Sequence, residues 1–364
     1  MNEPPDTVEI CEGTTRLIIP SDHSRRGPGK RTGSVFFNDQ MAFNRDISIS
    51  FFRGLDRDGM DVLDAMGGTG SRGTRIANEA GKGLEVFIND SNEEAHSYIE
   101  RNISLNRLEN AQACNQDLRC LLSRKVFHYV DVDPFGSPVP FLQSAIAGCR
   151  RKGIIAATAT DTAPLAGTYP KKCMRRYGAR PCRSRFGHEV GLRILIGHIA
   201  REAAKFDRGI RPVLCFYADH YFRVHLHLTE GGGRADESLR SLGYLEYDPE
   251  TGRREIMESG RHGPMWTGAL YDRDILERME SHDDLALPRR VKTFLDTCKQ
   301  ELDDPLFYES DEIGHILGGS PPPLDTIIES LRECGNASKT HFSPTGFKTE
   351  IPYQDLLSIM RDIM

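Results

Sequence analysis

Five short apolar segments alternate with helix-forming stretches between residues 61 and 230, and this alternation constrains the fold more than any other feature. The segments are 61–65, 84–89, 111–115, 126–132 and 153–159. The last is apolar without interruption, which is typical of a strand buried on both faces. Because strands that alternate with helices form parallel crossovers, the pattern predicts an α/β fold around a mostly parallel sheet.

A different pattern ends this region. Residues 213–217 are apolar, and residues 221–228 alternate apolar side chains with Arg223, His225 and His227. Only three residues separate the two segments, too few for a crossover helix, so the strands must pair as an antiparallel hairpin. A mostly parallel sheet with an antiparallel terminal hairpin is typical of the Rossmann-like S-adenosylmethionine-dependent methyltransferase fold, whereas the nicotinamide-binding Rossmann sheet stays parallel.

The glycine run 231–233 indicates a domain boundary. A chain of 364 residues is long enough for two domains. We expect a catalytic domain over 1–233, with an N-terminal extension over 1–60, and a smaller, mostly helical C-terminal domain over 234–364. Helices are predicted at 272–279, 288–302 and 323–334.

Charge and cysteine content exclude several classes of protein. Lys and Arg number 47 and Asp and Glu 53, which excludes a protein that coats nucleic acid with a uniformly basic surface. The numbers do not exclude local basic patches. No stretch of about 18 apolar residues would span a membrane. The start MNEPPDTVEICEG lacks the basic and apolar regions of a signal peptide. Nine cysteines without a CxxC pair indicate reduced thiols, and we expect a cytoplasmic protein.

A glycine-rich turn follows the first strand. Residues 68–73 read Gly-Thr-Gly-Ser-Arg-Gly, a G-x-G-x-x-G sequence between a strand and a helix. Asp90, at the end of the second strand, suits the hydroxyls of a ribose, and Asp117 could accept from an adenine amino group. The turn alone does not distinguish a dinucleotide from S-adenosyl-L-methionine. The hairpin favours the latter, and an NAD-dependent oxidoreductase stays the alternative.

A second turn, Asp133-Pro134-Phe135-Gly136, follows the fourth strand at the edge that faces the ligand crevice of an open α/β sheet. An exocyclic purine amine is a poor nucleophile because its lone pair is delocalised into the ring. Asp133 and the Pro134 carbonyl could accept its two N–H bonds, and Phe135 could stack on the base. The turn therefore predicts transfer to a base amine.

Six segments together resemble one known family. They read VFFNDQMAFNRDIS (35–48), DAMGGTGSRGTRIANE (64–79), FINDSN (87–92), NQDL (115–118), DVDPFGSP (131–138) and ATDTAPLAG (159–167). The combination resembles the tRNA (guanine-26 N2)-dimethyltransferase family in its archaeal-type short form. The resemblance implies an enzyme that transfers one or two methyl groups from S-adenosyl-L-methionine to the exocyclic N2 of guanine 26 in tRNA.

The resemblance also assigns site residues. Asp133 matches the catalytic acid, and Phe135 with either Phe36 or Phe37 would enclose the guanine. Alternation along a strand places only one of these two rings on the active face, so the choice between Phe36 and Phe37 stays open. The expected cofactor-binding residues are Arg45, Asp64, Gly68, Gly70, Arg72, Asp90, Asp117 and Leu118.

One departure from the family concerns zinc. Many members carry a four-cysteine zinc site in the second domain, but no cysteine lies between Cys215 and Cys298 in this chain. We therefore expect no metal, and we expect apolar packing to hold this region together.

A basic segment lies between Asp161 and Glu189, with no acidic residue between them. Its aromatic residues are Tyr169, Tyr177 and Phe186, and we expect a surface that contacts the tRNA backbone. A catalytically silent tRNA-binding module is a third hypothesis, which the presence of Asp90 and Asp133 opposes. Smaller clusters occur at Arg25, Arg26, Lys30 and Arg31 and at Arg289, Arg290 and Lys292. The cations of the segment are Lys171, Lys172, Arg175, Arg176, Arg180, Arg183 and Arg185.

Overall fold

A computed structural model describes residues 6–25, 35–55, 57–81 and 83–364. The chain divides into two compact units that interleave along the sequence. The first comprises residues 1–160, 225–228 and 273–295, and the second comprises 161–224, 229–272 and 296–364. The predicted functional division at residue 233 stays a prediction.

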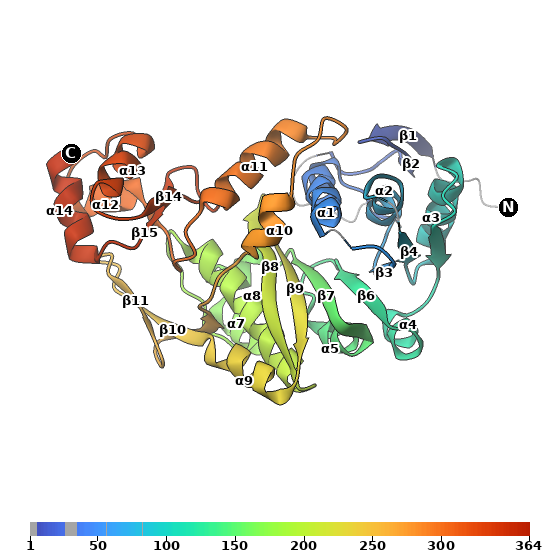
Figure 1. Cartoon of the computed structure of the whole chain (residues 1–364), viewed down its shortest axis with the longest axis horizontal. Coiled ribbons are helices and arrows are strands. Elements are labelled where there is room, and N and C mark those ends of the chain that lie inside the picture. The colour runs from blue at the N-terminus through green and yellow to red at the C-terminus, as the bar shows by residue number, and fades with distance from the viewer. Residues whose placement is uncertain (1–5, 26–34, 56, 82) are drawn as a thin grey trace. The chain divides into compact units, whose positions relative to one another are not determined.

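The largest sheet has seven strands in the order β5-β4-β3-β6-β7-β9-β8, and Figure 1 shows β6, β7, β9 and β8 side by side. Strands β3 to β7 pair in parallel, which confirms the predicted α/β sheet. Neighbouring apolar side chains such as Val62 and Val130 are fully buried. The parallel strands are β3 (Met60–Asp64), β4 (Leu84–Asn89), β5 (Ala111–Cys114), β6 (Phe127–Val132) and β7 (Cys149–Ala159).

The last two strands of this sheet are β8 (Arg208–Ala218) and β9 (Tyr221–Glu230). Only Asp219 and His220 connect them, so these neighbours run antiparallel. The predicted terminal hairpin is therefore confirmed, with longer strands than the sequence pattern indicated.

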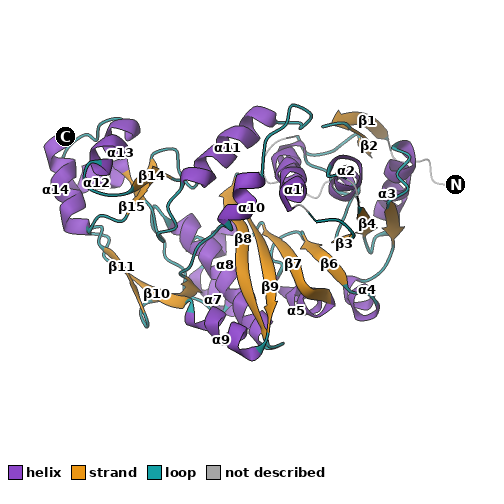
Figure 2. Cartoon of the chain, in the orientation of Figure 1, coloured by secondary structure: helices purple, strands orange, loops and turns teal. Residues whose placement is uncertain are grey.

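Helices alternate with the parallel strands, as the secondary-structure colours of Figure 2 show. Side chains at the helix starts explain where two of them begin. Asn92 caps α3 by accepting from the Glu94 backbone N–H, and Asp117 caps α4 by accepting from the Arg119 backbone N–H. The helices of this part are α1 (Ala42–Leu55), α2 (Ser71–Glu79), α3 (Glu93–Leu105), α4 (Leu118–Arg124) and α5 (Val139–Gly148).

The region before β3 contains more structure than the sequence predicted. Strands β1 (Thr7–Glu12) and β2 (Thr15–Pro20) form an antiparallel hairpin, and a short 3-10 helix, η1 (Asp39–Met41), precedes α1. Asn102 of α3 accepts from the Ile18 N–H at 2.6 Å and donates to the Thr69 carbonyl at 2.9 Å. One asparagine thus ties β2 to the glycine-rich turn.

The rest of the chain is richer in helix than in strand, but it contains two three-stranded sheets that the sequence did not predict. Strands β10 (Leu242–Tyr247), β11 (Arg254–Met257) and β12 (His262–Trp266) form one sheet. Strands β13 (Tyr308–Glu309), β14 (Ala337–Lys339) and β15 (Gly346–Thr349) form the other. The helices are α6 (Thr162–Leu165), α7 (Pro170–Tyr177), α8 (Gly187–Ala204), α9 (Gly232–Arg240), α10 (Arg273–Arg278), α11 (Pro288–Gln300), α12 (Ser310–Leu317), α13 (Leu324–Arg332) and α14 (Tyr353–Ile363).

The three helices predicted after residue 233 correspond to α10, α11 and α13. Helix α10 and the first residues of α11 belong to the first unit. Asp46 of α1 accepts from the Leu287 backbone N–H at 2.7 Å, and Arg53 pairs with Asp284 at 2.7 Å. These contacts hold the segment before α11 against α1. No helix in the described part of the chain is long and apolar enough to cross a membrane.

Candidate active site

The two turns singled out in the sequence lie at the same edge of the sheet. Strands β3 and β6 are parallel neighbours, with Asp64 opposite Asp131, so the turns that follow them leave at the same level. The chain continues from β3 to β4 on one side and from β6 to β7 on the other, which makes this point the switch point of the sheet. Arg72 from the glycine-rich turn bonds directly to Asp133 from the other turn. The two turns therefore form one site.

Two glycines shape the first turn. Gly68 and Gly70 have φ values of 55° and 76°, which side chains rarely tolerate. A Cβ atom on Gly70 would lie 2.9 Å from Ile99. The Gly68 N–H donates to Asp90 Oδ2 at 3.0 Å, and Asp90 Oδ1 accepts from the Asn92 N–H at 3.0 Å. Asp90 is thereby held beside the turn, as its predicted role requires.

The two residues predicted on the adenine side lie at the start of α4. Asp117 is exposed, and its Oδ1 accepts from the Arg119 N–H at 2.9 Å. Leu118 is buried. One carboxylate oxygen of Asp117 is therefore used in capping α4, whereas the other is open to solvent.

Two buried polar atoms near the glycine-rich turn have no hydrogen-bond partner among the residues that the structure describes. They are Thr69 Oγ1 in the turn and Asn44 Nδ2 on α1, whose amide oxygen accepts from Arg72 at 3.0 Å. Leaving such groups buried and unpaired costs about 1–3 kcal/mol each. A polar ligand would satisfy atoms of this kind, which fits a cofactor with hydroxyl, amino and carboxylate groups.

Arg72 is the centre of a charge network. Its Nη1 donates to Asn44 Oδ1 and to Ser48 Oγ at 2.8 Å, and its Nη2 donates to Asp133 Oδ2. Its Nε lies 3.7 Å from Asp131 Oδ2. Sequence reasoning missed Asn44, Ser48 and Asp131. The spacing of Asn44 and Ser48, four residues apart in a helix, was the available signal that they share a face.

Asp133 is placed as predicted, with one oxygen engaged. Oδ2 accepts from Arg72, whereas Oδ1 meets no donor in the part of the chain that the structure describes. Thr160, at the end of β7, supports the turn because its Oγ1 accepts from the Gly136 N–H at 2.8 Å and its own N–H donates to the Gly136 carbonyl at 2.9 Å. Asp133 thus keeps one acceptor oxygen on an anchored turn.

Asp64 lies beneath this network and is 2% exposed. Its Oδ2 accepts from the Gly73 N–H at 3.0 Å. Burial raises the pKa of Asp64 to about 7, because the nearby Arg72 offsets it only in part and the carboxylates of Asp131 and Asp133 add to it. The buried carboxyl group of Asp64, next to this network, therefore has a pKa near neutral pH.

Arg45 is placed differently from what its predicted role suggests. Its guanidinium is buried and forms a two-point ion pair with Glu12, at 2.6 Å from Nε and 2.5 Å from Nη2. Burial alone would raise the pKa of Glu12, but Arg45 and Arg75 outweigh it and hold that pKa below its ordinary value. Contact between Arg45 and a cofactor stays a prediction.

The structure separates the two candidate phenylalanines. Phe36 faces Phe135 edge to face, with ring centroids 4.7 Å apart, and Phe135 is 57% exposed. Phe37 is buried with Leu17 and Ile19, and the Arg45 guanidinium lies 4.7 Å from its ring centroid. Phe36 is therefore the ring on the side of Phe135, whereas Phe37 belongs to the core.

The predicted basic segment lies in the second unit and forms α7 and the loop after it. Cys173 and Tyr177 face inward, and the Tyr177 hydroxyl donates to Asp161 at 2.6 Å. Of the three aromatic residues, Tyr169 is exposed, whereas Tyr177 and Phe186 are fully buried. The prediction that all three belong to a binding surface is wrong for Tyr177 and Phe186, because both fill the core. Exposed cations of the segment are Lys171, Arg175, Arg176, Arg180, Arg183 and Arg185, and Lys172 is half-buried.

The smaller basic clusters are placed only in part. Arg26, Lys30 and Arg31 lie outside the described residues. Arg289, Arg290 and Lys292 are exposed on the portion of α11 that belongs to the first unit. The guanidinium of Arg290 lies 4.2 Å from the ring centroid of Phe43 on α1. This cluster therefore belongs to the compact unit that contains α1.

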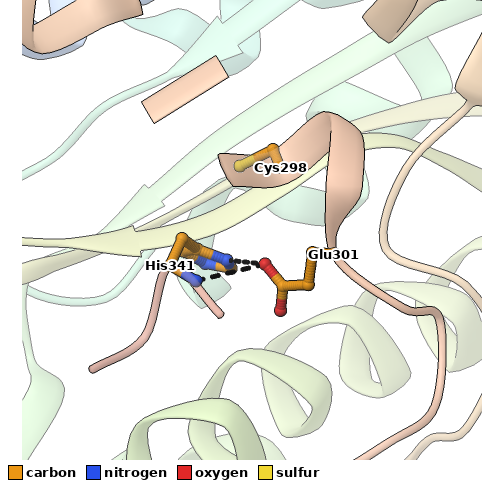
Figure 3. Close-up of side chains that lie close together, drawn as sticks. All are labelled: Cys298, Glu301 and His341. Carbon is orange, nitrogen blue, oxygen red and sulfur yellow. Dashed lines mark hydrogen bonds and ion pairs between the residues drawn. The ribbon is translucent and has the colours of Figure 1, made fainter. Parts of the chain in front are cut away.

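A buried group with the donor types of a metal site lies in the second unit. Figure 3 shows Cys298, Glu301 and His341, whose donor atoms lie within 4.8 Å of one another. His341 Nδ1 is 2.7 Å from Glu301 Oε2, and Lys348 Nζ is 3.1 Å from Glu301 Oε1. Burial would raise the pKa of Glu301, but His341 and Lys348 outweigh it and hold that pKa low. The Lys348 ammonium thus places a positive charge beside the Glu301 carboxylate, where a metal ion would place one. The expectation that no zinc is bound stays a prediction.

The sheet of β10, β11 and β12 is held by more than the expected apolar packing. Arg254 is buried, with its guanidinium 4.2 Å from the ring centroid of Phe186 and 4.1 Å from that of Tyr308. Its Nη2 lies 2.7 Å from Glu312 Oε2. The buried Arg254 guanidinium therefore joins β11 to α12.

The fold and the site together define the class of protein: a Rossmann-like methyltransferase, with a mostly parallel sheet, a terminal hairpin and two linked turns at the switch point. The family model described as "N2,N2-dimethylguanosine tRNA methyltransferase" matches residues 24–361. The chain belongs to this family. This assignment decides against the NAD-dependent oxidoreductase that the glycine-rich turn had left open.

Individual relatives agree with this assignment. A Pyrococcus abyssi protein named tRNA (guanine(26)-N(2))-dimethyltransferase is 39% identical over 98% of this chain and 99% of its own length. A Methanoregula boonei protein of the same name is 38% identical and covers 98% of each chain. The solved structure of Trm1 from Pyrococcus horikoshii with S-adenosyl-L-methionine has a TM-score of 0.89 and 38% identity, and the match covers 97% of this chain and 99% of that one.

Proposed function

We propose that this chain is a tRNA (guanine-26 N2)-dimethyltransferase that uses S-adenosyl-L-methionine and acts in the cytoplasm. The observation that carries the proposal is the placement of Asp133. Asp133 lies on a turn that Thr160 anchors, beside the glycine-rich turn, and its Oδ1 meets no donor among the described residues. The chain that carries this arrangement belongs to the methyltransferase family. That geometry suits an acceptor for the N–H bonds of a base amine next to a bound methyl donor.

The residues around the glycine-rich turn fit the cofactor. Asp90 would accept from the ribose hydroxyls, and Asp117 with the Leu118 backbone would contact the adenine. Thr69 Oγ1 and Asn44 Nδ2, which find no hydrogen-bond partner within the described ranges, support a polar ligand beside the glycine-rich turn. Bound S-adenosyl-L-methionine supplies a methyl group activated by its sulfonium. The remaining members of the proposed set are Arg45, Asp64, Gly68, Gly70 and Arg72.

The other turn would activate the amine. Asp133 Oδ1 and the Pro134 carbonyl would accept its two N–H bonds, which draws the lone pair of N2 out of the ring and orients it for in-line transfer. Asp133 is also placed to take the proton that N2 loses. After one transfer N2 keeps a single N–H, so a second transfer can use only one of the two acceptors.

The guanine must leave the base stack before it reaches this turn. Phe135 would stack on it, and Phe36 would contact its other side after the present edge-to-face pair opens. Stacking of this kind contributes about 1–3 kcal/mol per base. The seven cations at Lys171, Lys172, Arg175, Arg176, Arg180, Arg183 and Arg185 would bind tRNA phosphates.

A nucleoside analysis tests the proposal. The full chain is incubated with labelled S-adenosyl-L-methionine and unmodified tRNA that carries guanine 26, and the tRNA is digested to identify the labelled nucleoside. We expect N2-methylated and N2,N2-dimethylated guanosine, with none from a matched tRNA that carries adenine 26. Asp133→Asn, which keeps the size of the side chain but removes its charge, should abolish transfer and keep S-adenosylhomocysteine binding. Label elsewhere in the tRNA, or undiminished transfer by Asp133→Asn, would contradict the proposal.

A further inference from the structure

A backbone bridge in the second unit brings together two cationic segments that are far apart in the sequence. The Arg180 N–H donates to the Gly263 carbonyl and the Gly263 N–H donates to the Arg180 carbonyl, both at 2.8 Å. His262 Nδ1 lies 2.8 Å from the Pro181 carbonyl oxygen. These three contacts fasten the loop after α7 to the start of β12, and Arg261 precedes the bridging Gly263 by two residues, so both arginines start from paired backbone segments.

The charges of both arginines act on one imidazole, that of His262. Burial lowers the pKa of His262, and the charges of Arg261 and Arg180 lower it further, so both lie near this imidazole. Both arginines are exposed, and neither forms an ion pair with a carboxylate among the described residues. Glu246 lies at the same place, but its Oε1 accepts from the Arg261 backbone N–H at 2.6 Å rather than pairing with the side chain.

Like charges held side by side repel each other unless an anion neutralises them. Flexible surface arginines would move apart, but here the backbone bridge fixes the positions from which both side chains start. The planar donors of arginine suit the oxygens of a phosphate. The pair therefore has the chemistry of a phosphate-binding site on the edge of a small β-sheet.

We propose that Arg180 and Arg261 together bind one backbone phosphate of the tRNA. Arg261 thereby makes the sheet of β10, β11 and β12 part of the RNA-binding surface. This residue lies outside the basic clusters found in the sequence. This proposal rests on the proposed function because it takes tRNA as the ligand.

The salt dependence of tRNA binding tests the shared phosphate. Each phosphate contact adds roughly 0.7–0.9 to the slope of log K against log salt concentration. We expect Arg261→Ala to lower that slope by about this amount and to weaken binding on the order of tenfold. Arg261→Lys should restore most of the slope. Arg180→Ala should lower the slope by the same amount as Arg261→Ala. The double variant should lower the slope by the amount of one phosphate contact rather than two.

Arg253→Ala is the matched control, because Arg253 is an exposed arginine next to the same sheet that already pairs with Glu255 at 3.2 Å. It should leave the slope unchanged. S-adenosylhomocysteine affinity, measured for every variant, reports an intact fold. An unchanged slope for Arg261→Ala, or slope losses that add in the double variant, overturns the shared site. Methylation of guanine 26 by the unaltered chain is measured first, so that failure of the proposed function is seen separately.

Discussion

Phe36 and Phe37 are neighbours in the sequence with opposite environments, and replacing each by alanine tests the geometry of the site. Phe36 faces the exposed Phe135, so its ring is available to a base once that pair opens. Loss of one stacking ring weakens the binding of the base by about 1–3 kcal/mol. This loss lowers kcat/KM for tRNA roughly 5- to 150-fold. The lost edge-to-face pair lowers the free energy of unfolding by only about 0.5–1.5 kcal/mol.

Phe37→Ala should behave in the opposite way. Its ring is 3% exposed, packs against Leu17 and Ile19 and lies under the Arg45 guanidinium. Removal of a buried phenylalanine ring lowers the free energy of unfolding by about 3–5 kcal/mol. Methyl transfer should change little where the variant is still folded.

Two measurements separate these outcomes. Urea unfolding followed by circular dichroism gives the change in the free energy of unfolding. Initial rates with unmodified tRNA, taken under conditions where each variant is folded, give kcat/KM, and calorimetry with S-adenosylhomocysteine shows that the cofactor site is intact. If Phe37→Ala lost activity at full stability while Phe36→Ala kept it, the assignment of the two rings would be reversed.

Three further predictions concern stability, charge and the RNA surface. Because the folded-state pKa of Asp64 is raised to about 7, its ionisation destabilises the folded state as pH rises from about 4 to 7. Asp64→Asn should therefore gain stability relative to the parent over that range in urea titrations, and a constant difference would contradict this. Arg254→Met should lose about 3–5 kcal/mol of unfolding free energy because it removes the cation that pairs with the buried Glu312 carboxylate, and Glu312→Gln added to it should recover part of the loss. Tyr169→Ala, which removes a ring that is 58% exposed beside the α7 cations, should weaken tRNA binding without changing its salt slope, whereas Lys171→Glu with Arg175→Glu should lower the slope.

Local patterns carried much of the fold. Apolar strands of the right length, helix caps and a hairpin with a short connection are properties of neighbouring residues, so the sequence alone predicted the sheet and its antiparallel end. The meeting of the two turns also followed from it, because parallel strands on either side of a switch point release their turns at one edge. Asp90 and Asp133 lie where those rules place them.

Tertiary structure decided what local patterns do not encode. Asn44 and Ser48 meet Arg72, Phe36 rather than Phe37 faces Phe135, and the backbone of Arg180 pairs with that of Gly263, all through contacts between segments remote in the chain. The segment 273–295 likewise joins α1 in the first unit although it follows residue 233. Sequence periodicity reports whether a side chain is buried, but the partner it meets depends on how whole elements pack. That packing minimises exposed apolar surface and unpaired charge over the entire chain.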